Sequence, residues 1–73
     1  MLKFIQYHTT EENELCGCDG IRIVDGRYGL ERIKEIAIDN YKKLNLKEKG
    51  VIGYKIRSGS ILHSNSLTQF IKL

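Results

Sequence analysis

Residues 30–44, LERIKEIAIDNYKKL, predict the element around which the rest of the chain must fold. Apolar side chains recur there at intervals of three and four residues, which places them on one face of an α-helix, and charged side chains fill the opposite face. The apolar stripe consists of Leu30, Ile33, Ile36, Ala37, Tyr41 and Leu44. Because an isolated amphipathic helix is marginally stable in water, a second layer must cover this stripe.

Both ends of this helix carry recognisable signals. Gly29 fits the N-cap position, and Glu31 places a negative charge in the first turn, where the helix dipole is positive. Asn45 fits the left-handed residue that follows many helices, with Leu46 able to reach back to Tyr41. The helix is therefore predicted to run from Leu30 to Leu44.

The covering layer is predicted to be a β-sheet, since β-branched and aromatic residues and apolar–polar alternation flank the helix. The predicted strands span Leu2 to Thr9, Ile21 to Val24 and Val51 to Arg57, and residues 61–73 fit either a further strand, which we favour, or a short helix. A right-handed crossover makes the two strands that flank the helix parallel. The expected fold is a single α+β domain over residues 1–73, a two-layer ββαββ arrangement of one helix on a mixed sheet of three or four strands.

The composition predicts a globular, cytoplasmic chain. Of the 73 residues, 41% are apolar and 29% are charged, and no apolar run is long enough to span a membrane. The N-terminus turns polar too early for a signal peptide, and two cysteines cannot form the disulfide framework of a small secreted protein. Domains of this size often gain stability from a metal or a second subunit, so a homodimer is among the expected states.

Charge is unevenly distributed along the chain. Residues 1–26 carry two basic and five acidic residues, a net charge of −3, whereas residues 27–73 carry ten basic and four acidic residues, a net charge of +6. Such a split favours steered encounter with charged partners. Two candidate partner-binding surfaces follow: an acidic loop with Glu11, Glu12, Glu14 and Asp19, and a basic edge of the third strand with Lys47, Lys49, Lys55 and Arg57.

Cys16-Gly17-Cys18 is the one motif that resembles a chemical site. Two thiolates can chelate zinc, and His8 and His63 would complete four nitrogen and sulfur ligands if the fold brought them together. The common zinc pattern uses two separated ligand pairs of short spacing, whereas these histidines lie 8 and 45 residues from the nearer cysteine. Two reduced cysteines near the edge of the core explain the motif without a metal. Zinc is therefore an alternative, and no other cofactor is expected.

No enzymatic activity is expected. The acidic neighbours of Cys16 disfavour a reactive thiolate, and the chain contains no nucleophile elbow, P-loop or dinucleotide fingerprint. Nucleic-acid binding through the basic strand edge stays open, since 12 basic residues outnumber 9 acidic ones, although no zinc-finger, KH or RNP-type signature appears.

Together these features favour a non-enzymatic protein-interaction module. Its isoleucine- and lysine-rich composition is typical of low-GC bacteria and their phages, so its concrete form would be a phage-type accessory inhibitor of a host protein. The contacts would come from the acidic loop and the basic strand edge. The alternatives are a nucleic-acid-binding accessory protein and a small zinc-binding domain.

Overall fold

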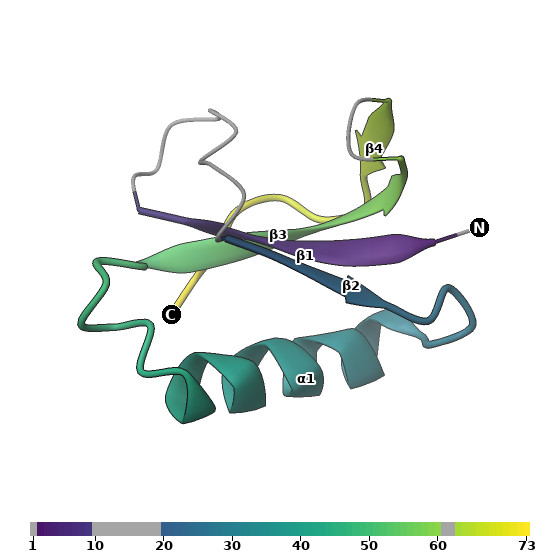
Figure 1. Ribbon diagram of the computed structural model, residues 1–73. Helices are drawn as coiled ribbons and strands as arrows, with labels where there is room; N and C mark the ends of the chain where they lie inside the picture. The colour runs from purple at the N-terminus through teal and green to yellow at the C-terminus, as the bar shows by residue number, and fades with distance from the viewer. Residues whose placement is uncertain (1, 10–19, 61–62) are drawn as a thin grey trace.

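The computed structural model describes residues 2–9, 20–60 and 63–73, which fold into one helix lying against one face of a β-sheet (Figure 1). The strands are β1 (Lys3–His8), β2 (Ile21–Val24), β3 (Gly53–Gly59), β4 (Ser64–Ser66) and β5 (Ile71–Lys72), and the helix is α1 (Leu30–Lys43). The predicted α+β fold, with one helix on one sheet, is confirmed. The bounds of β2 are those predicted, whereas β3 lies two residues further toward the C-terminus than predicted.

β1 lies between β2 and β3 in the sheet. It pairs antiparallel with β2 on one side, where Phe4 faces Ile23, and antiparallel with β3 on the other, where Ile5 faces Ile56. β2 and β3 therefore run in the same direction, as predicted, but they are not neighbours. Every pair among the described strands is antiparallel, so the prediction of a mixed sheet is wrong. The reason is that β1 fills the space between the two strands that the helical crossover connects.

The C-terminal segment covers the other side of β3 in two steps. β4 pairs with the end of β3, and β5 pairs with its beginning. Between them, the N–H groups of Leu67 and Thr68 donate to the carbonyl of Ile56 at 2.8 and 3.3 Å, and Thr68 Oγ1 accepts the N–H of Ile56 at 3.1 Å. A side-chain hydroxyl thus replaces a backbone carbonyl where this edge is interrupted. The strand predicted within residues 61–73 is present as two short strands, so the sheet has five strands and not the predicted three or four.

The core lies between α1 and the sheet. The helix contributes Ile33, Ile36, Ala37 and Tyr41, and the sheet contributes Ile5, Tyr7, Val24, Tyr54 and Ile56. The hydroxyl of Tyr7 donates to the carbonyl of Ala37 at 2.7 Å, so the sheet is also hydrogen-bonded to the helix. Leu30 and Leu44, at the two ends of the predicted stripe, are exposed. The stripe is therefore buried only at its centre.

Both helix ends match the sequence signals. Gly29 is the N-cap, with φ −73° and ψ 165°, and Asn45 has a left-handed φ of 53°. The N–H of Leu46 donates to the carbonyl of Tyr41 at 3.0 Å, and the N–H of Asn45 to that of Lys42 at 3.2 Å, the bond pair of a Schellman motif. In the described part of the chain, no helix has the length and apolar character needed to cross a bilayer.

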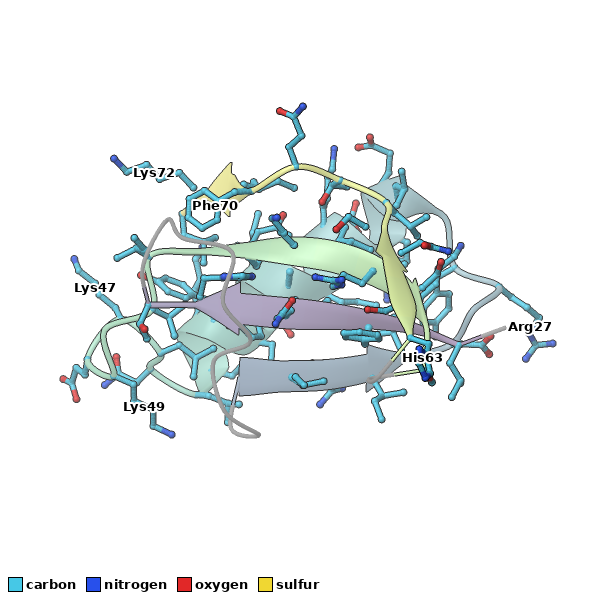
Figure 2. The ribbon with its side chains drawn as sticks, turned by 90° about the horizontal axis from the view of Figure 1, so that it is seen from above. Arg27, Lys47, Lys49, His63, Phe70 and Lys72 are labelled. Atoms are coloured by element: carbon cyan, nitrogen blue, oxygen red, sulfur yellow. The ribbon has the colours of Figure 1, made fainter. Side chains whose placement is uncertain are left out.

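The sheet face turned away from α1 is partly covered as well. Gln6 and His8 point to this face and are buried. The ring of Phe70 lies edge-on to the ring of His8, with centroids 5.9 Å apart, and fills the space beside Gly53 where a side chain would otherwise lie (Figure 2). Arg57 Nη1 donates to Gln6 Oε1 at 3.3 Å.

Candidate functional site

β2 forms one edge of the sheet. Among residues 2–9, 20–60 and 63–73, no strand pairs with its outer side. Alternate residues of an edge strand direct their N–H and C=O groups outward, where an added strand can bind them. The sequence of β2, IRIV, contains no proline or lysine, and Arg22 is its single charged residue. The opposite edge, by contrast, consists of strands of only three and two residues.

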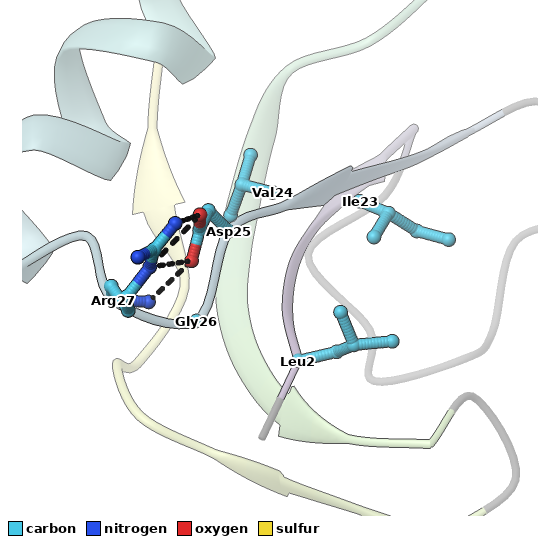
Figure 3. Close-up of a pocket in the computed structure, with 6 residues that line it drawn as sticks. All are labelled: Leu2, Ile23, Val24, Asp25, Gly26 and Arg27. Atoms are coloured by element: carbon cyan, nitrogen blue, oxygen red, sulfur yellow. Dashed lines mark hydrogen bonds and ion pairs between the residues drawn. The ribbon is translucent and has the colours of Figure 1, made fainter.

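Two apolar side chains lie exposed beside the β2 edge. Ile23 is 56% exposed and Leu2 is 57% exposed. Both point away from α1, because Ile23 faces Phe4 and Leu2 precedes Phe4 by two residues. Figure 3 shows them near each other along an open hollow of about 670 Å³, which is lined by Leu2, Ile23, Val24, Asp25, Gly26 and Arg27. We call this β2 edge, together with Leu2 and Ile23, the β2 surface.

An ion pair lies at the end of the hollow. Arg27 Nη2 is 2.9 Å from Asp25 Oδ2, and the backbone N–H of Arg27 donates to Asp25 Oδ1 at 2.9 Å (Figure 3). Hydrogen bonds from the Arg27 side chain and backbone lower the pKa of the Asp25 carboxyl. The Arg27 side chain is 91% exposed, so this pair shapes the turn after β2 and contributes little to stability.

Arg22 supplies a positive charge on the other face of the same edge. It lies opposite Ile5, and directly opposed residues of a ladder share a face, so Arg22 is on the side of the sheet that α1 covers. Its side chain is exposed, and no carboxylate among the described residues lies within ion-pair distance of it. The β2 surface therefore has an apolar face and a cationic face.

The predicted basic edge of β3 is not an edge, because β3 lies between β1 on one side and β4 and β5 on the other. Arg57 donates from Nε to Ser64 Oγ at 2.8 Å as well as to Gln6, and Lys55 is half-buried. Lys47 and Lys49 are exposed in the turn between α1 and β3. The four residues thus do not form one surface. The alternation of β3 identified its two faces correctly, but alternation does not show whether a strand is central.

The predicted zinc ligands are not brought together. His8 faces Gly53 at the start of β3, whereas His63 precedes Ser64, which faces Gly59 at its end. Six residues of strand span about 20 Å, and zinc needs each ligand atom within about 2.3 Å. One ion cannot bind both histidines in this fold, so the set of four ligands is wrong. Cys16 and Cys18 lie outside the described residues, within which no three His, Cys, Asp or Glu side chains form a potential metal site.

The acidic loop cannot be placed on the structure. Glu11, Glu12, Glu14 and Asp19 all lie outside the described residues. Their role in partner binding stays a prediction.

The β2 surface was missed by sequence reasoning, although the strand itself was predicted. Ile21, Ile23 and Val24 do not indicate which side of the strand is exposed, and the strand was predicted only to run parallel to β3 and to share its helix-covered face. No residue of β2 signals the exposed edge, because the strand order that creates it depends on pairing with residues distant in the sequence. Comparison of the chain with protein-family models, curated proteins and solved structures finds no match.

Proposed function

We propose that this chain is a non-enzymatic protein-interaction module that binds an extended segment of another protein at the outer edge of β2. The observation that carries this proposal is the coincidence of a regular strand edge with two adjacent apolar side chains, Leu2 and Ile23, that are each more than half exposed. In this binding mode, strand addition, an extended segment joins the sheet as a further strand. Pairing of backbone groups supplies affinity, and contacts to alternate side chains supply specificity.

The remainder of the fold suits this role. Ile5 and Val24 anchor β1 and β2 to the core beneath the edge, so an added strand would meet a rigid template. A rigid template lowers the entropy lost on binding. An accessory inhibitor of a host protein, of the phage type expected from composition, is one form that such a module would take.

Affinity capture with matched variants tests the proposal. The wild-type chain, Ile23→Lys and Ile38→Lys are immobilised and exposed to lysate of the native host. Ile38, on α1, is 43% exposed and provides a control of the same chemistry away from the edge. A partner retained by the wild type and Ile38→Lys but lost by Ile23→Lys is the expected result. Equal retention by all three chains, or by none, contradicts the proposal.

A second proposal is polyanion binding at the end of the sheet where α1 finishes. Lys47, Lys49 and Lys72 are exposed and lie at the same end of the molecule (Figure 2). Nucleic acid bound by these lysines would release counterions, so retention on a polyanion column should fall steeply with salt. Triple replacement by Gln should abolish that dependence. Retention that is independent of salt, or unchanged in the variant, contradicts nucleic-acid binding.

A further inference from the structure

We infer that the segment received by β2 is acidic, with carboxylates alternating with apolar side chains. This inference rests on the proposed function and specifies its partner. Successive side chains of any strand point to opposite faces, whether the strand is added parallel or antiparallel. The residue opposite Ile23 would therefore lie on the apolar face with Leu2, and the residue opposite Arg22 would lie on the face that α1 covers.

The cationic face determines the charge of the incoming segment. Arg22 is exposed and is not paired with any described carboxylate, and Lys3, in the next strand, is on the same face. The amine of Lys3 donates to the carbonyl of Tyr28 at 2.8 Å, which holds its charge close to this face. Asp25, the acidic residue after β2, is already bound by Arg27. A carboxylate opposite Arg22 gains a favourable contact, and a lysine there is repelled.

The same charge argues against a second copy of this chain as the occupant. Two β2 strands paired antiparallel about a two-fold axis would bring both Arg22 side chains to the same face, either directly opposed or diagonal to each other. Like charges in that arrangement are destabilising.

The apolar face determines which residues alternate with the carboxylates in the incoming segment. Ile23 and Leu2 line an open hollow whose remaining lining residues belong to the end of β2 and the turn after it. A branched aliphatic side chain opposite Ile23 would pack on Ile23 and remove part of its surface from water. The expected motif thus alternates a branched aliphatic residue with Asp or Glu over four or more residues.

A selection from random ten-residue peptides, displayed and panned on the full-length protein, tests the inference. The wild type, Arg22→Glu and Ile23→Lys are compared, with Arg32→Glu as control because Arg32 lies exposed on α1. All four are first confirmed to be folded by circular dichroism. The wild type and Arg32→Glu should enrich aliphatic residues alternating with Asp or Glu, and Arg22→Glu should enrich Lys or Arg at the acidic positions. For one enriched peptide, Arg22→Glu should weaken binding by up to about twentyfold, since the lost ion pair is worth a factor of up to about five and the like-charge repulsion that replaces it a similar factor.

Some results would contradict only the acidic character of the segment, and others would contradict strand addition at β2 as well. Enrichment of extended apolar peptides with no charge preference, unchanged by Arg22→Glu, overturns the inference and leaves strand addition standing. Enrichment of nothing on the wild type, or of the same peptides on Ile23→Lys, overturns both. Sedimentation provides a further outcome: a wild-type dimer that Ile23→Lys dissociates would make a second copy the occupant and would contradict an acidic partner.

Discussion

Phe4 and Ile23 lie directly opposite each other in the ladder between β1 and β2, yet Phe4 is 1% exposed and Ile23 is 56% exposed. The two side chains share a face of the sheet, so the boundary between buried and exposed apolar surface falls between them. That boundary is where a partner strand would extend the covered surface.

The free energy of unfolding should be far more sensitive to substitution of Phe4 than to substitution of Ile23. Phe4→Ala removes a buried aromatic ring and is expected to lower the free energy of unfolding by about 3–5 kcal/mol. Ile23→Lys changes an exposed side chain and is expected to change it by about 0.5 kcal/mol or less. Urea unfolding followed by circular dichroism measures both. A large loss for Ile23→Lys would show that Ile23 supports the fold and would invalidate its use as a binding variant.

Thr68 should stabilise the fold through its hydroxyl. Thr68→Val keeps the shape of the side chain but removes the acceptor of the Ile56 N–H, and an unsatisfied donor in this partly buried position costs about 1–3 kcal/mol. Thr68→Ser keeps the acceptor and should lose less. Equal loss for the two variants in urea unfolding would show that the methyl group of Thr68, and not its hydroxyl, contributes the stability.

Gly53 should not tolerate a side chain while Phe70 is present. A Cβ atom there would overlap the ring of Phe70 and the carbonyl of Ile71, so Gly53→Ala is expected to destabilise the protein by about 1–3 kcal/mol. In a Phe70→Ala background the same change should cost less, because the ring is gone. A double-mutant cycle measured by thermal unfolding tests this, and strictly additive losses would contradict the packing of Phe70 over Gly53.

Stability should fall at alkaline pH because of Tyr7. Burial raises the pKa of the Tyr7 hydroxyl above its usual value of 10.0, outweighing the opposing hydrogen bond from Asn40, and burial also raises the pKa of Tyr54. The native state therefore holds these protons more tightly than the unfolded state. Their contribution is complete below pH 10 and is lost as the pH rises toward the native pKa values.

Tyr7→Phe isolates this effect. The variant should lose about 1 kcal/mol at pH 8, because the hydroxyl no longer donates to the carbonyl of Ala37. Between pH 8 and pH 11 it should then lose less stability than the wild type. Unfolding curves at both pH values provide the comparison, and parallel losses in the two proteins would rule out Tyr7 as a source of the alkaline dependence.

Local elements could be predicted from the sequence because local signals specify them. The helix ends at Gly29 and Asn45 follow from cap preferences, and the bounds of β2 follow from the acidic loop before it and the turn Asp25-Gly26 after it. The order of strands is different, because pairing joins residues far apart in the sequence. Nothing in the alternation of β3 indicates that β1 occupies one of its sides and the C-terminal segment the other.

The candidate site was hidden for the same reason. Ile23 is an apolar residue in a short apolar strand, and only the position of β2 in the sheet makes it exposed. Arg57, conversely, looked like a surface cation and is bound to Gln6 and Ser64. In both cases tertiary pairing, which residue type alone does not encode, determines whether a side chain is available to a partner.

Amide hydrogen exchange at residue resolution, on the full chain with and without an enriched peptide, tests the docking of a strand at β2 most directly. Strand addition predicts that binding slows exchange at amides within residues 21–24 and leaves those of residues 64–73 unchanged. Slowed exchange at residues 64–73, with residues 21–24 unaffected, would contradict it.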